Sequence, residues 1–172
     1  PATPRRAPRR TVRVLESLAA KHGQLIDITV FGASMDELAD NAIRLPKEIR
    51  NQGVLTQTEV SGVLRQSDLF LDLSDYQAFG RTGIEAMASG CVPVLPVFGG
   101  SGEYVKHWVN GILVDTRIDG AMLEEIDMFI GLSSERRRAM RAAAIETAGR
   151  YTVEKAAISE IALFSQVLRS PA

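Results

Sequence analysis

Short apolar segments with strand character alternate with segments of helical period along most of this chain. The alternation is typical of an α/β fold, in which crossover helices connect the parallel strands of a sheet. The predicted strands cover 25–31, 54–55, 69–73, 92–96 and 111–115. The first predicted helix begins at Pro4 or Pro8 and ends before Gly23. Further helices are predicted at 35–42, 58–66, 82–89, 104–109 and, with two breaks, 121–169. We therefore expect a parallel sheet of about five or six strands with helices on both faces.

Local composition adds three expectations about these elements. Pro93 and Pro96 cannot donate a ladder hydrogen bond, so the strand that contains them should be short or paired on one side. The Gly-Gly-Ser-Gly segment at 99–102 predicts a flexible turn. Ser133 or Ser134 is expected to cap the helix that follows the first break in the C-terminal helical region.

Length and charge limit the classes of protein to which the chain can belong. Its 172 residues fit one domain, and 45% hydrophobic with 24% charged residues is the balance of a globular protein. A net charge of -1 gives no general attraction to nucleic acid or to an anionic membrane. The single cysteine, Cys91, cannot form an internal disulfide, and we expect a cytoplasmic protein. The N-terminus has neither an apolar signal core nor an initiator methionine, which favours an excised or processed piece.

The loop between the predicted strand 69–73 and the predicted helix 82–89 is the richest candidate site. In an open parallel sheet, ligands bind beyond the carboxyl ends of the strands, where helix N-termini also lie. Free N–H groups at the helix start can bind a phosphate, and glycine allows close approach to the backbone. Glu85 follows within the first turn, where its carboxylate could accept hydrogen bonds from the two hydroxyls of a ribose. The alternative is that Glu85 only stabilises the end of its helix.

Arginines crowd the N-terminus, at positions 5, 6, 9, 10 and 13. They could neutralise a diphosphate near the start of the first helix or form a basic arm that binds nucleic acid. For Arg9, Arg10 and Arg13 a solvated helix face is the favoured interpretation. Arg5 and Arg6 precede that helix or begin it, so we expect these two to contact a ligand.

The run from Ser74 to Val94, Ser-Asp-Tyr-Gln-Ala-Phe-Gly-Arg-Thr-Gly-Ile-Glu-Ala-Met-Ala-Ser-Gly-Cys-Val-Pro-Val, resembles the signature of the group 1 family of GT-B glycosyltransferases. That signature places two glutamates with seven residues between them, and the spacing from Gln77 to Glu85 reproduces it. Three further segments resemble family motifs in the expected order: Gly-Gly-Ser-Gly-Glu at 99–103, Asn-Gly-Ile-Leu-Val-Asp at 110–115, and Tyr-Thr-Val-Glu-Lys-Ala at 151–156. In the last segment Val153 replaces the usual tryptophan.

The resemblance implies the fold and the activity. It implies that residues 1–172 form a Rossmann-like nucleotide-sugar-binding domain, the C-terminal half of a GT-B enzyme whose N-terminal acceptor domain and first strand are absent. Such an enzyme transfers a hexosyl group from a nucleoside diphosphate sugar to a glycan or lipid-linked acceptor, as in polysaccharide biosynthesis. We expect no metal, no cofactor other than the donor substrate and no nucleic-acid partner. Peripheral membrane contact through the missing half is left open.

The resemblance also assigns roles to individual residues. Glu85 is expected to hold the ribose, and the residues after Phe79 to offer backbone N–H groups to the diphosphate and sugar. The implied donor-binding residues are Arg5, Arg6, Phe79, Gly80, Arg81, Thr82 and Glu85. The implied catalytic residues are Gln77 and Glu85. The run Pro-Ala-Thr-Pro-Arg-Arg at 1–6 is similar to a subgroup of rhamnan-forming rhamnosyltransferases.

Gln77 departs from the family pattern, which has a glutamate at this position. An amide can bond sugar hydroxyls, but it cannot stabilise a developing positive charge by Coulomb attraction. This keeps a second hypothesis open, a non-catalytic nucleotide-binding or regulatory module. A flavodoxin-like or response-regulator domain would need an acidic cluster at the strand ends, which the sequence lacks, and an arginine arm on nucleic acid would show steep salt dependence.

Overall fold

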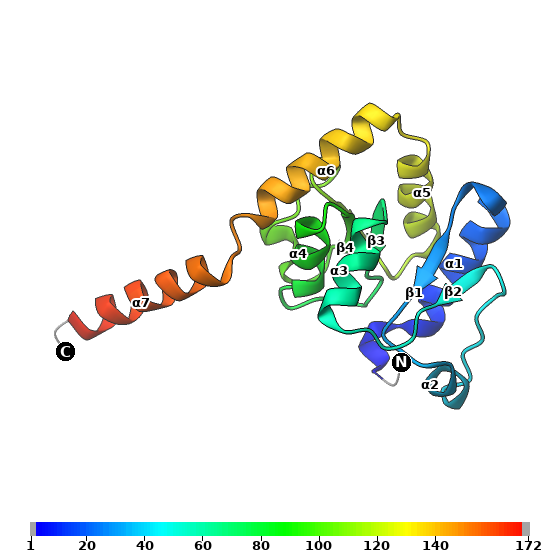
Figure 1. Cartoon of the computed structure of the whole chain (residues 1–172), viewed down its shortest axis with the longest axis horizontal. Helices are drawn as coiled ribbons and strands as arrows, with labels where there is room; N and C mark the ends of the chain where they lie inside the picture. The colour runs from blue at the N-terminus through cyan, green and yellow to red at the C-terminus, as the bar shows by residue number, and fades with distance from the viewer. Residues whose placement is uncertain (1–2, 170–172) are drawn as a thin grey trace.

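The structure, a computed structural model, describes residues 3–169 and has an α/β architecture with parallel strands (Figure 1). The strands are β1 (Ile28–Val30), β2 (Ile49–Asn51), β3 (Leu69–Leu71), β4 (Val92–Pro96) and β5 (Ile112–Val114). β1 pairs with β2, and β4 lies between β3 and β5, all in parallel. The expected parallel α/β fold is therefore confirmed, but within residues 3–169 its strands form two hydrogen-bonded sheets in place of one.

Helices separate the strands from β1 to β4 in the order expected, and a 3-10 turn separates β4 from β5. The helices are α1 (Pro8–His22), α2 (Met35–Asp40), α3 (Gln57–Arg65), α4 (Arg81–Ala88), α5 (Asp119–Ile130), α6 (Ser134–Ala148) and α7 (Val153–Arg169), with short 3-10 turns η1 (Pro4–Arg6), η2 (Gly23–Leu25) and η3 (Gly100–Glu103). Side-chain caps start several of them. Ser34 and Thr56 form capping boxes with Glu37 and Glu59, and Ser133 accepts the Arg136 N–H at the start of α6.

Helices cover both faces of the strands. On one face, side chains of α1 and α5 pack against alternate strand residues such as Val92 and Val94, and residues of β1 and β2 join the same cluster. On the other face, Ile84 and Met87 of α4 and Ala144 of α6 pack around Leu95. Alternation along a strand sends successive side chains to opposite faces, so both faces of β4 are buried.

Two sequence-based elements are wrong. The predicted strand 54–55 is absent and Val54 is 72% exposed; β2 lies earlier, where Ile49 is buried and pairs with Ile28. The predicted helix 104–109 is also absent. The Asn110 side chain accepts the Lys106 N–H and donates to the Tyr104 carbonyl, and these bonds compete with a regular helical turn.

β4 is paired on both sides despite its two prolines, so the one-sided alternative is wrong, while the other expectation, a short ladder, agrees with the three registered pairs on each side. Val92 donates to the Asp68 carbonyl and Val94 accepts from the Asp72 N–H, so even-numbered residues bond to β3. The missing N–H of Pro93 therefore faces β5, before the first registered pair of Val94 with Ile112. The missing N–H of Pro96 faces the β3 side, but it lies beyond the last registered pair of these two strands, Leu71 with Val94. Both prolines lie where no ladder bond is lost.

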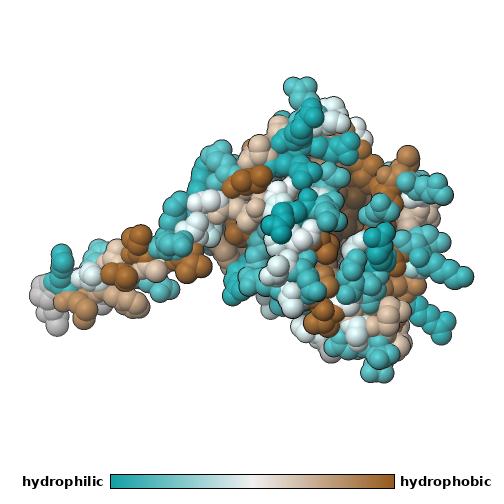
Figure 2. Space-filling view, in the orientation of Figure 1, coloured by the Kyte–Doolittle hydropathy of each residue, from teal (hydrophilic) through white to brown (hydrophobic). Residues whose placement is uncertain are grey.

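α7 extends away from the body of the molecule (Figure 1). Apolar side chains interrupt its hydrophilic surface in the space-filling view (Figure 2). The large exposed ones are Val153, Ile158, Ile161, Leu163, Phe164 and Leu168. Among the described residues, none of the helices has the length and apolar character needed to cross a membrane.

Candidate functional site

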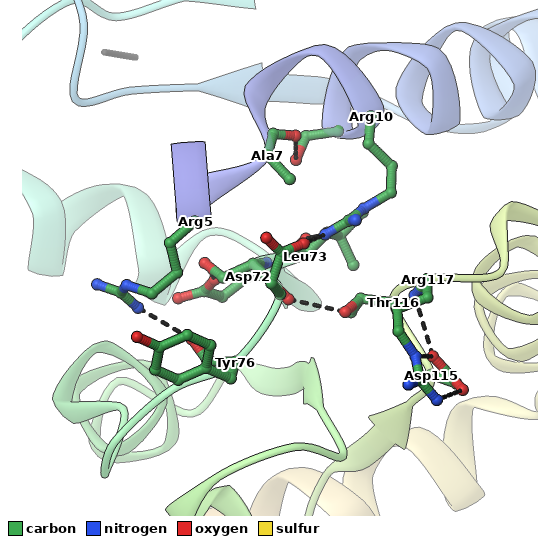
Figure 3. Close-up of polar contacts among 12 residues, drawn as sticks. Arg5, Ala7, Arg10, Asp72, Leu73, Tyr76, Asp115, Thr116 and Arg117 are labelled. Carbon is green, nitrogen blue, oxygen red and sulfur yellow. Dashed lines mark hydrogen bonds and ion pairs between the residues drawn. The ribbon is translucent and has the colours of Figure 1, made fainter. Parts of the chain in front are cut away.

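The N-terminal turn and the start of α1 lie against the carboxyl ends of β3 and β5 (Figure 3). Arg10 Nη2 donates to the Leu73 carbonyl at 2.7 Å, and the Asp75 N–H donates to the Arg5 carbonyl at 2.9 Å. From β5, the buried Thr116 hydroxyl donates to the Ser74 carbonyl at 2.8 Å. Residues 72–77, which follow β3, are therefore fixed from both sides at the sheet edge where ligands of such folds bind.

A buried carboxylate, Asp72, organises this loop. It is 7% exposed, and its Oδ1 accepts the Ser74 N–H at 3.1 Å and the Ser74 hydroxyl. Its Oδ2 accepts from Gln77 Nε2 at 2.5 Å and from Arg6 Nη1 at 3.1 Å. Sequence reasoning missed Asp72 as a site residue. The available indication was a single charged residue within an apolar strand, close to its carboxyl end.

Arg5 and Arg6 both contact the loop after β3, and the expectation that they bind a ligand stays a prediction. Arg5 Nη1 donates to the Tyr76 carbonyl at 2.9 Å and lies 3.3 Å from Gln77 Oε1, and its guanidinium lies 5.3 Å from the centre of the Tyr76 ring. Arg6 is the ion-pair partner of Asp72. A pair of guanidinium groups therefore lies beside the loop from Asp72 to Gln77.

The other three N-terminal arginines behave differently from one another. Arg9 and Arg13 are exposed, where they bond the Asn41 carbonyl and Asp119. Arg10 is not part of a solvated face, because its side chain is only 15% exposed and ion-pairs with Asp75. The expectation of a solvated face is thus wrong for Arg10.

α4 begins directly after the loop, with Gly80 in the left-handed region at φ 81°. The Gly83 N–H donates to the Gly80 carbonyl at 2.8 Å, whereas within residues 3–169 the N–H groups of Arg81 and Thr82 have no acceptor. The Arg81 side chain is 85% exposed and lies 3.9 Å from Glu85, which is 39% exposed. Two free donors at a helix start form a local anion-binding geometry.

The glycines of this segment also pack closely against Tyr104, a role that the sequence did not indicate. A Cβ at Gly80 would lie 2.9 Å from the Tyr104 hydroxyl oxygen, and one at Gly83 would lie 2.6 Å from it. The Tyr104 hydroxyl donates to the Gly80 carbonyl at 2.8 Å, and burial raises the pKa of Tyr104 to about 12. Tyr104 is therefore neutral, and its hydrogen bond to Gly80 fixes the backbone at the start of α4 from the buried side.

Phe79 packs behind the helix start together with this tyrosine. Its ring centroid lies 5.2 Å from that of Tyr104 and 5.7 Å from that of Tyr151. Tyr151 comes from the junction of α6 and α7, so the aromatic segment at 151–156 reaches the site loop. Such ring pairs stabilise the position of the backbone that they flank.

The Gly-Gly turn after β4 fits tightly against the same loop. The Gln77 N–H donates to the Phe98 carbonyl at 3.2 Å, and the Gly100 N–H donates to the Gln77 carbonyl at 2.9 Å. A Cβ at Gly99 would lie 1.8 Å from the Gln77 carbonyl oxygen, and one at Gly100 would lie 2.0 Å from that of Ala78. The segment expected to be a flexible turn is instead a close backbone contact that requires glycine.

A second charged group, also missed from the sequence, lies at the end of β5. The Arg117 guanidinium donates two hydrogen bonds to the Asp115 carboxylate, and its central carbon lies 4.0 Å from the centre of the Phe98 ring. The Arg117 hydrogen bonds hold the pKa of Asp115 at about 2. Asp115 therefore stays ionised, and Figure 3 shows the pair across the loop from Arg5.

Neither histidine belongs to the loop after β3. His22 ends α1, and its Nε2 lies 2.6 Å from Asp127 of α5, while His107 Nδ1 accepts the Leu113 N–H at 3.1 Å. In the part of the chain that the structure describes, no cluster of three or more His, Cys, Asp or Glu residues could hold a metal ion.

Comparison with known proteins identifies relatives of the chain. The family model described as "Glycosyl transferases group 1" matches residues 3–147. D-inositol 3-phosphate glycosyltransferase of Segniliparus rotundus is 31% identical over 135 residues, which are 78% of this chain and 28% of that protein. GDP-mannose:cellobiosyl-diphosphopolyprenol alpha-mannosyltransferase of Komagataeibacter xylinus is 30% identical over 115 residues, which are 66% of this chain and 29% of that protein. The chain thus spans less than a third of either relative.

Solved structures share its fold. A glycosyltransferase of Rickettsia africae superposes with a TM-score of 0.78 at 19% identity, covering 97% of this chain and 46% of that one. HepE of Anabaena, solved in complex with UDP and glucose, gives a TM-score of 0.75 at 20% identity. The superposition covers 92% of this chain and 45% of that one. At this identity the likeness extends to the fold alone.

Proposed function

Because the chain belongs to the group 1 glycosyltransferases, we propose that it forms the donor-binding half of a two-domain GT-B enzyme. The proposal rests mainly on one observation: the free N–H groups of Arg81 and Thr82 begin a helix at the carboxyl edge of the sheet. The Arg5 and Arg6 guanidinium groups reach the loop that leads into this helix. These two sources of positive charge suit the diphosphate of a nucleotide sugar.

Glu85 is the proposed ribose ligand. It lies one turn into α4, and its partly exposed carboxylate has a distant partner in Arg81, at 3.9 Å. Its acceptor oxygens are therefore available for two adjacent hydroxyl groups. Gly80, Arg81 and Thr82 would hold the diphosphate by their backbone, while Phe79 supports that backbone by packing. The expectation that Gln77 contacts the donor sugar remains a prediction.

The proposed reaction is transfer of a hexosyl group from a nucleoside diphosphate sugar to a glycan or lipid-linked acceptor. The support is the family, together with a relative whose name describes mannosyl transfer to a polyprenol-linked acceptor. A role in polysaccharide biosynthesis, and the rhamnan-forming subgroup, are proposals of the same kind. In this reaction the chain would orient the donor and neutralise the departing diphosphate.

We further propose that the acceptor half and the first strand of the sheet lie outside these residues. β1 and β3 each have one edge without a strand partner among residues 3–169, and their apolar residues are only partly buried. A parallel strand between them would complete one continuous sheet. Without the acceptor half, we expect this chain to bind nucleotide weakly and to transfer no sugar.

Calorimetric titration of the chain with UDP, GDP, ADP and dTDP tests the proposal. We expect one base to be preferred and Glu85→Ala to weaken that nucleotide's binding by about tenfold to hundredfold, since hydrogen bonds to a charged group contribute about 1.5–3 kcal/mol. Glu146→Ala is the matched control, because Glu146 lies on α6, its side chain is 73% exposed, and its ion-pair partner is Arg150, just beyond the end of that helix. Equal binding by Glu85→Ala and the control would remove Glu85 from the site.

The second candidate function is a non-catalytic nucleotide-binding module, and Gln77 favours it. The described loop carries an amide where the family motif has a glutamate, so an expected negative charge is missing from that position. Assays of the full-length protein separate the two functions. Nucleotide-sugar binding without turnover, in the presence of acceptor, would support the module over the transferase.

A further inference from the structure

The Gln77 side chain has hydrogen-bond partners at both ends. Its Nε2 donates to Asp72 Oδ2 at 2.5 Å and to the Ser74 hydroxyl oxygen at 3.2 Å, and its Oε1 accepts from Arg5 Nη1 at 3.3 Å. Gln77 is only 6% exposed. An amide has two donor hydrogens, and both are used inside the protein.

Asp72 is equally enclosed and equally bonded. Its two oxygens accept from Ser74, Gln77 and Arg6, and it is 7% exposed. The carboxylate and the amide therefore hold the two arginines of η1, one each. Arg6 is bound by Asp72 and Arg5 by Gln77.

We infer that Gln77 is a positioning residue whose partner Asp72 carries the negative charge that the family motif has at position 77. Together the two side chains fix Arg5 and Arg6 where a diphosphate would bind. The inference rests on the proposed donor-binding function, but it assigns Gln77 a role that acts through the arginines and needs no contact with the sugar. It also explains why position 77 is an amide, since only a donor can face the Asp72 oxygen at 2.5 Å.

The charge arrangement makes a specific prediction about Gln77→Glu. A carboxylate at position 77 would meet that of Asp72 in a buried site, where the charged groups facing the pair are Arg6 on Asp72 and Arg5 beside position 77. The atom that replaces Nε2 would still face Asp72 Oδ2, now 2.5 Å from Nε2, and two like charges at this separation favour one group keeping its proton. The pKa of one carboxyl would rise above its unfolded value. The folded state would then bind more protons than the unfolded state, so the variant would lose stability as the pH rises.

The exchange variant Asp72→Asn/Gln77→Glu provides the rescue. It keeps one carboxylate and one amide in the pair, and the net charge of the loop is that of the native chain. Gln24→Glu is the matched control, because Gln24 is exposed and gains the same charge. Melting temperature at pH 5 and pH 8, and affinity for inorganic pyrophosphate, are measured for all four proteins.

At pH 8 we expect Gln77→Glu to melt below the native chain and to bind pyrophosphate at least about tenfold more weakly, with both deficits smaller at pH 5. In the exchange variant, the loss of melting temperature between pH 5 and pH 8 that the Gln77→Glu variant shows should disappear. The exchange variant should also regain most of the native affinity for pyrophosphate. Native behaviour of Gln77→Glu at pH 8, or an exchange variant no better than it, would overturn the inference. If the native chain bound neither pyrophosphate nor nucleotide, the donor-binding function would fail, while the melting temperatures would still test the Asp72–Gln77 coupling.

Discussion

Single residues at the edge of the sheet act mainly on the backbone of the loop from Asp72 to Gly80. Tyr104 bonds the Gly80 carbonyl, Thr116 bonds the Ser74 carbonyl, and Arg10 bonds the Leu73 carbonyl. The bonds from Thr116 and Arg10 pair carbonyls that would otherwise be costly to bury, and Tyr104 adds a second donor to the Gly80 carbonyl, which also accepts the Gly83 N–H. The loop approaches the start of α4 in one conformation, which leaves the Arg81 and Thr82 N–H groups free.

Gly99 gives the sharpest single-residue prediction. It has φ of 100°, and an added Cβ would lie 1.8 Å from the Gln77 carbonyl oxygen, a backbone atom that cannot move away alone. We expect Gly99→Ala to lower the free energy of unfolding by at least about 2 kcal/mol and to weaken nucleotide binding. Urea denaturation measures the first effect and calorimetry the second.

Gly102→Ala is the control for that change, since Gly102 belongs to the same turn and a Cβ there meets no atom within 4 Å. It should leave both stability and binding close to those of the native chain. If Gly99→Ala were as stable as Gly102→Ala, the close contact between the Gly-Gly turn and the loop would not exist in solution.

Among the elements, α1 and α5 are joined at one end by a charged contact. Lys21 Nζ lies 2.5 Å and His22 Nε2 2.6 Å from the two oxygens of Asp127. Burial raises the pKa of Asp127, but the hydrogen bonds from Lys21 and His22 outweigh it, so the net shift is downward. A lowered pKa means that the contact stabilises the fold when the pH is above the unfolded value of about 3.9.

We therefore expect Asp127→Asn to be less stable than the native chain at pH 7. The difference should begin to shrink as the pH falls below about 4, because the unfolded carboxyl is then protonated, and it should vanish once the pH falls below the lowered pKa of the native carboxyl. Urea denaturation at pH 7 and at pH 3.5 measures this difference. Glu124→Gln, at an exposed position on the same helix, should show no such pH dependence. A stability gap for Asp127→Asn that was constant over this pH range would contradict the assignment.

Elements with a strong local pattern could be predicted from the sequence, and those set by distant contacts could not. Capping residues such as Ser34, Thr56 and Ser133 act within one turn, so the starts of α2, α3 and α6 were close to expectation. β2 depends on the pairing of Ile49 with Ile28, and no local pattern distinguishes it from the apolar Val54–Leu55 pair nearby. The same applies to 104–109, where Asn110 replaces helical bonds by side-chain bonds.

For the candidate site, sequence patterns predicted a position but not the contacts inside it. The motif spacing led to Gln77, Glu85 and the start of α4, and the basic run led to Arg5 and Arg6. Asp72 was missed because its ion-pair partner Arg6 comes from a distant segment that meets the loop only in the folded chain, and because its bond to Gln77 depends on the conformation of the loop. For the same reason the sequence could not show that Gly80 and Gly83 pack against Tyr104.

At the scale of the whole molecule, the strands form two sheets, and β1 and β3 each have one edge without a strand partner within residues 3–169. Even-numbered residues of β3 bond to β4, as Asp72 does with Val94, so Leu69 and Leu71 direct their N–H groups to the opposite edge. We expect the amides of Leu69 and Leu71 to exchange with solvent much faster than that of Asp72. Hydrogen exchange followed by NMR provides the comparison within one strand. Equal protection of Leu71 and Asp72 would mean that another strand pairs with β3 in solution.

The central claim is that a nucleoside diphosphate binds at the start of α4, and NMR titration of the chain tests it most directly. Amide shifts are followed while UDP, GDP, ADP and dTDP are added in turn to saturation. The account predicts that the preferred nucleotide moves the amides of Gly80, Arg81, Thr82 and Glu85 most, with smaller changes at Arg5 and Arg6 and none over the exposed face of α6. Shifts centred on any other surface, or none with all four nucleotides, would contradict it.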